Sequence, residues 1–210
     1  MTPRCAVIVF AKAPVAGTVK TRLAGVLGAA GAARLAARML EATAACALEA
    51  RLGTVEVCCA PDASHPAFTA LARSSTAVAL TEQSDGDLGR RMQRAFERAL
   101  ASQPCAIVIG TDVPALDAAY LRDAATALQA HDAVIGPAVD GGYALIGLRR
   151  PAAALFDGVE WSTPRVLAQT RERLRILGWR WAELAPLHDI DEPADLRHLP
   201  AGWAPLAMQE

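Results

Sequence analysis

The sequence CAIVIGTDVP, residues 105–114, contains the pattern around which the rest of the chain is organised. Its first five residues are uncharged and apolar, several of them β-branched, as in a strand buried on both faces of a sheet. Gly110 and Thr111 end this run, and Pro114 prevents its continuation. Asp112 is therefore expected just beyond the carboxyl end of a strand, where open α/β sheets bind ligands. There it either holds Mg²⁺ or only makes an Asx turn before the proline.

Strand-like and helix-like segments alternate on both sides of this stretch. Strands are predicted at residues 4–11, 54–60, 77–80, 105–109, 133–137, 143–148 and 180–184, and helices or helical turns at 21–27, 32–50, 67–73, 87–102, 117–130, 151–156, 163–174 and 193–199. This order predicts an α/β fold, a three-layer α/β/α sandwich, formed by residues 1–210 as one domain. The strands flanking Asp140-Gly141-Gly142 are too close for a crossover, so the sheet is expected to be mixed and mostly parallel.

Composition narrows the classes of function. Hydrophobic residues make up 53% and charged residues 20% of the 210 residues, which excludes a disordered chain. The formal charge of −1 predicts no nucleic-acid partner. Five cysteines without a C-x-x-C pair favour free thiols in a reducing, cytoplasmic setting. No signal-peptide pattern precedes the first strand, and no apolar run of about 18 residues predicts a membrane span.

The loop after the first predicted strand is basic. In KAPVAGTVKTRL, residues 12–23, Lys12, Lys20 and Arg22 surround Gly17. Cations in a Gly/Pro loop at the carboxyl end of a strand suit a polyphosphate, although a solvated basic turn has the same composition. Gly17 and Lys20 are not adjacent, which excludes a Walker loop, and the dinucleotide fingerprint G-x-G-x-x-G is absent.

A second candidate loop runs from Gln83 to Arg90. Its glycines, including Gly86, permit close backbone approach, and Gln83 offers a donor and an acceptor to a nucleobase edge. The alternative is ordinary helix capping by Asp87. The Asp140-Gly141-Gly142 turn is expected to open on the same sheet edge as Asp112.

Near the end of the chain, His188-Asp189-Ile190-Asp191 places two carboxylates on one face if the segment is extended, with Ile190 facing the core. With Asp112, Asp189 and Asp191 would complete an oxygen-ligand Mg²⁺ site, the alternative being an acidic surface turn. His188 is a minor candidate ligand. Trp161-Ser162-Thr163-Pro164 is interpreted as a helix start with Thr163 as N-cap, and an acceptor-pocket role is its alternative.

Several of these motifs together resemble a bacterial family of glycosyltransferase-A-like proteins, the radical-SAM/selenodomain-associated transferases. They are FAKAPVAGTVKTRL (10–23), GDLGRRM (86–92), GTDVP (110–114), GPAVDGGYALIGL (136–148), WSTP (161–164) and DIDEPADL (189–196). More distantly, the chain is similar to 2-phospholactate and molybdenum-cofactor guanylyltransferases. The resemblance implies a nucleotide-diphospho-sugar transferase fold, a nucleotide donor and a Mg²⁺-dependent site. The pyrophosphorylase turn G-x-G-x-R is missing.

Carried over by position, the resemblance implies that Lys20 and Arg22 hold the donor phosphates, with the loop from Gln83 to Arg90 near the base. It implies that Asp112 binds the metal and that Asp189 or Asp191 occupies the late metal-side position.

The predicted function is therefore a transferase dependent on Mg²⁺ or Mn²⁺ that uses a nucleotide or nucleotide-sugar donor and a small-molecule acceptor. Lys20 and Arg22 would stabilise charge, and Asp140 or Asp191 would act as general base in glycosyl transfer, which the resemblance favours. Nucleotidyl transfer to a phosphorylated acceptor, with release of pyrophosphate, is the first alternative. A non-catalytic nucleotide-binding module is the second.

Overall fold

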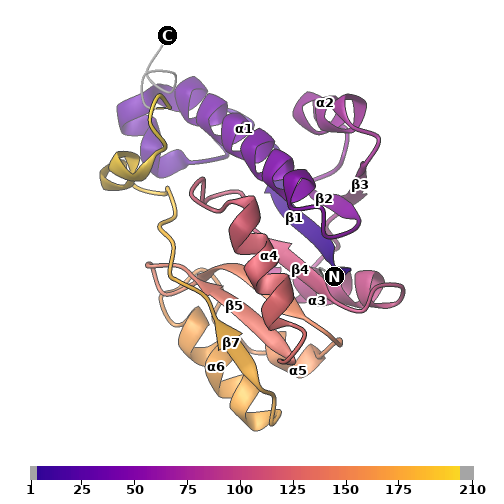
Figure 1. Cartoon of the computed structure of the whole chain (residues 1–210). Coiled ribbons are helices and arrows are strands. Elements are labelled where there is room, and N and C mark those ends of the chain that lie inside the picture. The colour runs from indigo at the N-terminus through magenta and orange to yellow at the C-terminus, as the bar shows by residue number, and fades with distance from the viewer. Residues whose placement is uncertain (1–3, 204–210) are drawn as a thin grey trace.

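A computed structural model describes residues 4–203, in which seven strands form one sheet (Figure 1). The strands are β1 Ala6–Lys12, β2 Val55–Ala60, β3 Val78–Glu82, β4 Ala106–Ile109, β5 Ala133–Pro137, β6 Tyr143–Leu148 and β7 Trp181–Glu183. The α-helices are α1 Ala24–Ala50, α2 Pro66–Ser74, α3 Leu88–Leu100, α4 Ala118–Ala127, α5 Ala153–Phe156 and α6 Val166–Ile176. Two 3₁₀ helices, η1 Thr21–Leu23 and η2 Pro193–His198, are the first and the last helical elements of the described residues.

The sheet is mixed and mostly parallel, as the sequence predicts. Its strand order is β3-β2-β1-β4-β6-β5-β7, and β6 runs antiparallel to both of its neighbours, β4 and β5. The other pairs are parallel. The Asp140-Gly141-Gly142 connection between β5 and β6 is too short for a crossover, which explains why β6 is the reversed strand.

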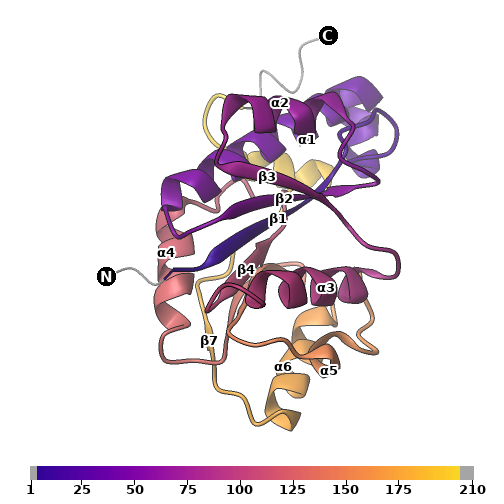
Figure 2. The same ribbon diagram turned by 90° about the vertical axis from the view of Figure 1, so that its right-hand side faces the viewer.

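Helices cover both faces of the sheet. Along β1, Val7 and Val9 belong to a core with α1, α2 and α4, whereas Ala6 and Ile8 belong to a core with α3, α5 and α6. Figure 2 shows the two helical layers on opposite sides of the strands. Burial on both faces explains why the central strands are apolar throughout instead of alternating, and it confirms the three-layer prediction.

The strand order changes direction at β1 and β4. From β1 the chain builds outward to β2 and β3, and then returns to add β4 on the other side of β1. The loops after the carboxyl ends of β1 and β4 diverge at such a point and leave a crevice. Lys12 ends β1 and Gly110 follows β4, so the basic loop and Asp112 leave the sheet beside this crevice.

The segment after β7 returns to the same edge of the sheet. Ile190 is fully buried in a third core, where it packs with Leu23, Leu35 and other side chains of η1 and α1. Its N–H donates to the carbonyl of Asp112 at 2.9 Å. The expectation that Ile190 faces the core is confirmed, and this backbone bond places Asp191 next to Asp112.

Helix α1 begins earlier than expected, at Ala24 instead of residue 32, with Gly28 as a break of non-helical backbone (φ 69°, ψ 162°). The helical segment 21–50 has a mean hydropathy of 1.3 and is, by length and composition, long and apolar enough to cross a membrane. The prediction that the chain has no membrane span therefore stays a prediction. Buried core helices meet the same criteria, and Leu35 and Met39 of α1 are buried here.

All five cysteines are free and buried. This agrees with the prediction that they form no disulfide framework, because each acts as a small apolar side chain of the core.

Candidate functional site

A cavity of about 420 Å³ opens at the carboxyl ends of β1 and β4, at the crevice where the strand order reverses. We name it the Lys20 cavity. Its polar lining comes from the basic loop, from the loops after β3 and β4, and from the segment after β7: Lys12, Thr18, Lys20, Gln83, Asp112 and Asp191. Its apolar lining comes from strands and helices and includes Phe10, Met92, Val108, Tyr143 and Ile146.

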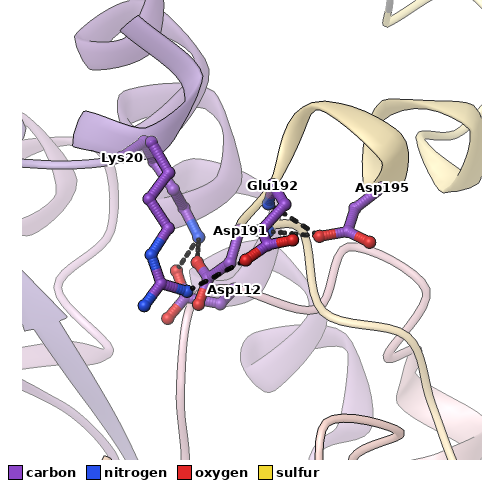
Figure 3. A network of polar contacts seen from close by, with 6 residues as sticks. Lys20, Asp112, Asp191, Glu192 and Asp195 are labelled. Carbon is purple, nitrogen blue, oxygen red and sulfur yellow. Dashed lines mark hydrogen bonds and ion pairs between the residues drawn. The ribbon is translucent and has the colours of Figure 1, made fainter.

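The Lys20 ammonium lies between two carboxylates in this cavity (Figure 3). Its Nζ is 2.5 Å from Asp112 Oδ1 and 2.7 Å from Asp191 Oδ1. Only 6% of the Lys20 side chain is exposed, whereas the Asp112 and Asp191 side chains are 52% and 44% exposed. Burial acts to lower the pKa of Lys20, but attraction to the two carboxylates and their hydrogen bonds outweigh it, so the pKa is raised.

Three local features hold these side chains in place. Lys20 has left-handed backbone (φ 46°), and its carbonyl accepts the N–H of Leu23 at 2.9 Å as η1 begins. Asp112 follows β4, and its carbonyl holds the segment that carries Asp191. Asp195 Oδ2 then accepts the N–H groups of Asp191 and Glu192 at 3.1 and 2.7 Å, in a capping box at the start of η2.

The donor set fits part of a Mg²⁺ or Mn²⁺ site. Asp112 and Asp191 direct one oxygen each to a single cationic atom, the Lys20 nitrogen, and carboxylate oxygens are the ligands that these ions prefer. The remaining ligands would be water and phosphate oxygens, as is usual for Mg²⁺. Within residues 4–203, no group of three acidic, histidine or cysteine side chains is placed to hold a metal ion. Asp189 therefore does not complete a three-carboxylate set in this arrangement.

Asp189 instead lines a second cavity of about 250 Å³, which we name the Trp161 cavity. Asp112 and Asp191 line both cavities and so form the wall between them. The other polar lining of the Trp161 cavity comes from Asp140, Asp189, Trp161, Ser162 and Thr163. Burial raises the pKa of Asp189, and the negative charges of Asp140, Asp191 and Asp195 raise it further.

Some residues of the predicted donor site lie as expected, and others do not. Lys12 lines the Lys20 cavity, and its Nζ donates to the carbonyl of Thr18 at 3.2 Å. Gly17, with a φ of 81°, provides the left-handed turn of the loop. Arg22 lies outside the Lys20 cavity and pairs with Glu192 at 3.5 Å, because η1 turns its side chain toward η2.

The loop after β3 differs more from the prediction. Gln83 lines the Lys20 cavity, but its amide already donates to the carbonyls of Cys58 and Ala11 at 3.0 and 3.4 Å. Gly86 has a φ of 106°, as a loop glycine permits, yet is absent from the cavity lining. Arg90 lines a different cavity, between α3 and α5, since the first turn of α3 directs it away from β1.

Helix α6 begins at Val166 with Arg165, and not Thr163, as its N-cap residue. The Thr163 hydroxyl nevertheless accepts the N–H of Arg165 at 3.3 Å, and it donates to the carbonyl of Glu160 at 2.7 Å. Asp87 does cap α3, where its carboxylate accepts the N–H of Arg90 at 2.8 Å.

The aromatic lining of the site did not follow from the sequence pattern. Phe10 and Tyr143 line the Lys20 cavity, although each belongs to an apolar strand and has the pattern of a core residue. One signal was present for Tyr143. Because β6 runs antiparallel to β4, its first residue, Tyr143, lies at the sheet edge where β4 ends and Asp112 follows. The sequence predicts this antiparallel strand, so it also predicts this position of Tyr143.

The fold and the crevice together define the class of protein to which this chain is similar. The chain has the fold of the nucleotide-diphospho-sugar transferases. It is 30% identical to a provisionally named nucleotide-diphospho-sugar transferase from Desulfovibrio desulfuricans G20, with a TM-score of 0.83 over 90% of this chain and 83% of that chain.

More distant structures share only the fold. CMP:2-keto-3-deoxy-manno-octonic acid synthetase in complex with CTP is 15% identical, with a TM-score of 0.56 over 92% of this chain and 96% of that chain. Rv0371c from Mycobacterium tuberculosis H37Rv in complex with manganese is 17% identical, with a TM-score of 0.52 over 94% of this chain and 98% of that chain.

Residues 43–163 match the family described as "Uncharacterized protein conserved in bacteria (DUF2064)", and the chain belongs to this family. No functionally curated protein matches the sequence. The comparisons do not support the radical-SAM-associated subtype, which stays a prediction.

Proposed function

We propose that this protein is a transferase dependent on Mg²⁺ or Mn²⁺ that uses a nucleotide-sugar donor and transfers the sugar to a small-molecule acceptor. The observation that carries the proposal is the shared position of Lys20, Asp112 and Asp191 between two adjoining cavities at the reversal point of the sheet. The relative at 30% identity supports a nucleotide-diphospho-sugar donor.

The Lys20 cavity is the proposed donor side. Lys12 and Lys20 bring two ammonium groups to a cavity large enough for part of a nucleotide, and cations placed at developing negative charge stabilise a leaving diphosphate. Asp112 and Asp191 would hold the metal ion, which supplies Lewis-acid neutralisation of the diphosphate charge. Lys20 would then exchange a carboxylate for a phosphate oxygen. The CTP and manganese complexes of the fold neighbours agree with this arrangement.

The Trp161 cavity is the proposed acceptor side. An acceptor hydroxyl held there would attack the anomeric carbon of the donor sugar, and the bond from that carbon to the phosphate oxygen would break. The nucleoside diphosphate leaves with the bonding electron pair, and the hydroxyl proton passes to the carboxylate of Asp140. Asp140 is an exposed carboxylate whose Oδ1 accepts the N–H of Gly142 at 2.8 Å, which fixes its orientation.

Nucleotidyl transfer is the second candidate, because Lys12 and Lys20 give the donor side the positive charge that a nucleoside triphosphate requires. There an acceptor phosphate would attack the α-phosphorus and pyrophosphate would leave. A cytoplasmic location, one domain and no nucleic-acid partner complete the proposal. They stay predictions.

Ligand-induced thermal stabilisation tests the proposal. Nucleoside triphosphates and the matching nucleotide-sugars are each measured with and without Mn²⁺. We expect one nucleotide-sugar to raise the melting temperature more than its triphosphate does, and only with the metal. Asp112→Asn should lower turnover of that donor about 100-fold or more, because it removes a metal ligand.

Asp123→Asn is the matched control, since Asp123 is an exposed carboxylate on α4 outside both cavities. Greater stabilisation by the triphosphate, with release of pyrophosphate, would favour the nucleotidyl alternative. Equal stabilisation with and without Mn²⁺ and no turnover of any donor would contradict the transferase and leave a nucleotide-binding module.

A further inference from the structure

The two cavities that meet at Asp112 and Asp191 differ in charge. Lys12 and Lys20 line the Lys20 cavity. Among the described residues that line the Trp161 cavity there is no lysine, arginine or histidine, whereas Asp140 and Asp189 add two carboxylates to the shared pair. Neither Asp140 nor Asp189 forms an ion pair within the described chain. Arg22, which lines an adjoining cavity together with Asp140 and Asp189, pairs with Glu192.

The negative charge persists when the donor side is filled. Lys20 and a bound divalent ion offset Asp112 and Asp191, and the donor diphosphate uses the rest of that positive charge. Asp140 and Asp189 are left without compensation and face the space next to the reacting sugar. A phosphate or carboxylate on the acceptor would have to enter this field, and like charges at such short range repel strongly in a partly enclosed site.

The walls of the Trp161 cavity are closely fitted. A Cβ on Gly141 would lie 2.3 Å from the carbonyl oxygen of Pro164, and one on Gly89 would lie 2.6 Å from Trp161 Nε1. The carbonyl of Gly141 also accepts the N–H of Leu167 at 2.9 Å. These contacts join the turn before β6 and the start of α3 to residues 161–164. The turn that carries Asp140 is therefore packed closely against residues 161–164.

Ser162 adds an indication that this wall serves a ligand. It has left-handed backbone with a φ of 63°, which is uncommon for a residue other than glycine, and it lines the cavity beside the Trp161 indole. Such strain concentrates at binding sites, where the surrounding structure maintains it. At about 30 Å³ for each water molecule, 250 Å³ corresponds to roughly eight waters, the size of a small polyol or one sugar ring.

We infer that the Trp161 cavity binds an acceptor that carries hydroxyl groups and no phosphate or carboxylate. Asp140 and Asp189 accept hydrogen bonds from the acceptor hydroxyls, and the indole of Trp161 packs against its C–H face. The inference rests on the proposed transferase function and refines it, because a phosphate-free acceptor attacks through a hydroxyl and so performs glycosyl transfer rather than nucleotidyl transfer.

The electrostatic part can be tested without donor or turnover. The native cysteines are all buried, so a cysteine introduced by Ser162→Cys reports on the Trp161 cavity and one introduced by Thr18→Cys reports on the Lys20 cavity. Each variant is treated at low salt with a cationic and an anionic methanethiosulfonate reagent of similar size. Ser74→Cys, on the exposed side of α2, gives the reference ratio of the two rates.

We expect the Ser162→Cys thiol to favour the cationic reagent about tenfold more than the Ser74→Cys thiol does. The Thr18→Cys thiol should stay close to the reference ratio, because two lysines and two aspartates line the Lys20 cavity. Adding Asp140→Asn to Ser162→Cys should bring the ratio back toward the reference. If Ser162→Cys does not fold, Thr163→Cys reports on the same wall. A ratio at Ser162 equal to the reference, or shifted toward the anionic reagent, would overturn the inference.

The chemical part uses matched acceptors with the donor found by thermal stabilisation. Glycerol is compared with glycerol 3-phosphate, and glucose with glucose 6-phosphate, by the rate of nucleoside diphosphate release. We expect the phosphate-free member of each pair to accelerate release at least tenfold more. Faster release with the phosphorylated members would overturn the inference while leaving the transferase standing. Expected thiol ratios without stabilisation by any donor would instead contradict the proposed function, and only the negative charge of the Trp161 cavity would remain supported.

Discussion

The Lys20 cavity and the Trp161 cavity share a wall and are built in different ways. The Lys20 cavity lies over the sheet, at the carboxyl ends of β1 and β4, and part of its lining is apolar side chains that also belong to the core, among them Met92, Val108 and Ile146. The Trp161 cavity lies beside the reversed strand β6, between a tight turn and the segment before α6. The first lies where open α/β sheets bind ligands, whereas the second depends on packing between loops.

The difference shows how two neighbouring spaces acquire unequal charge. The cations come from the end of β1 and the loop that follows it, and the carboxylates come from the segments after β4, β5 and β7. Lys20 offsets one charge of the Asp112–Asp191 pair at the boundary and Lys12 offsets the other, whereas Asp140 and Asp189 keep the Trp161 cavity negative. Substitutions on either side should therefore have distinguishable consequences.

The largest effect is expected where the Trp161 cavity depends on close backbone approach. Gly141→Ala should lower the free energy of unfolding by about 3 kcal/mol, because it adds a clash with the Pro164 carbonyl to the strain of a residue at φ 92°. Chemical denaturation measures the loss. Near-neutral stability would show that the turn and residues 161–164 are not packed as described.

Gly17→Ala, in the loop of the Lys20 cavity, is the matched control. Gly17 also has a positive φ, 81°, but a Cβ there meets nothing within 4 Å. Only the backbone strain of the positive φ remains, and the free energy of unfolding is expected to fall by about 1 kcal/mol. A loss as large as that of Gly141→Ala would indicate that backbone strain alone, without close packing, explains both.

A smaller effect is expected at the shared wall. Lys20→Met should lower the free energy of unfolding by about 2 kcal/mol, because it removes two charge-assisted hydrogen bonds and leaves Asp112 and Asp191 to repel each other. Their partial exposure keeps the loss below that of a fully buried pair. Added Mn²⁺ should restore the melting temperature, since the ion would occupy the position between the carboxylates.

Lys12→Met is the control for the shared wall, because Lys12 is exposed and forms no ion pair within the described residues. Its stability should stay within about 0.5 kcal/mol of the wild type, with or without the metal. If Mn²⁺ fails to stabilise Lys20→Met, the metal-binding role proposed for Asp112 and Asp191 is wrong.

The smallest effect is expected at an ion pair outside both cavities. This pair gives a reference for how much a surface ion pair contributes to the free energy of unfolding. Hydrogen bonds from Arg171 lower the pKa of Glu183, at Nε–Oε1 and Nη2–Oε2 distances of 2.8 and 2.6 Å. A carboxyl whose folded pKa is lowered stabilises the fold above its ordinary pKa and loses this contribution as the pH falls through the folded pKa. Glu183→Gln should therefore cost up to about 1 kcal/mol at pH 7 and almost nothing at pH 2.

The pH dependence is read from urea denaturation at both pH values. Glu172→Gln is the comparison, because the Glu172–Arg175 pair is about 60% exposed on both side chains and should contribute less at either pH. A pH-independent loss for Glu183→Gln would mean that packing, and not charge, explains its effect.

Much of the architecture could be predicted because the signals are local. The apolar run before Gly110 predicts a strand buried on both faces, and the short connection at Asp140-Gly141-Gly142 predicts its antiparallel neighbour. The buried position of Ile190 also followed from alternation along an extended segment. Gln83 and Arg90 could not be placed in the same way, because their side-chain directions depend on how β2, α3 and α5 pack.

The sequence by itself determined the succession of strands and helices along the chain. It also determined that Lys20 and Asp112 gather at one edge of the sheet. Both follow from periodicity and strand polarity, which are properties of short segments. What only the tertiary structure decided is the division of the carboxylates. Asp191 joins Asp112 around the Lys20 ammonium, and Asp189 lines the Trp161 cavity instead. This division depends on the path of the chain after β7, which the bond from the Ile190 N–H to the Asp112 carbonyl fixes, a contact between segments far apart in sequence that no local pattern encodes.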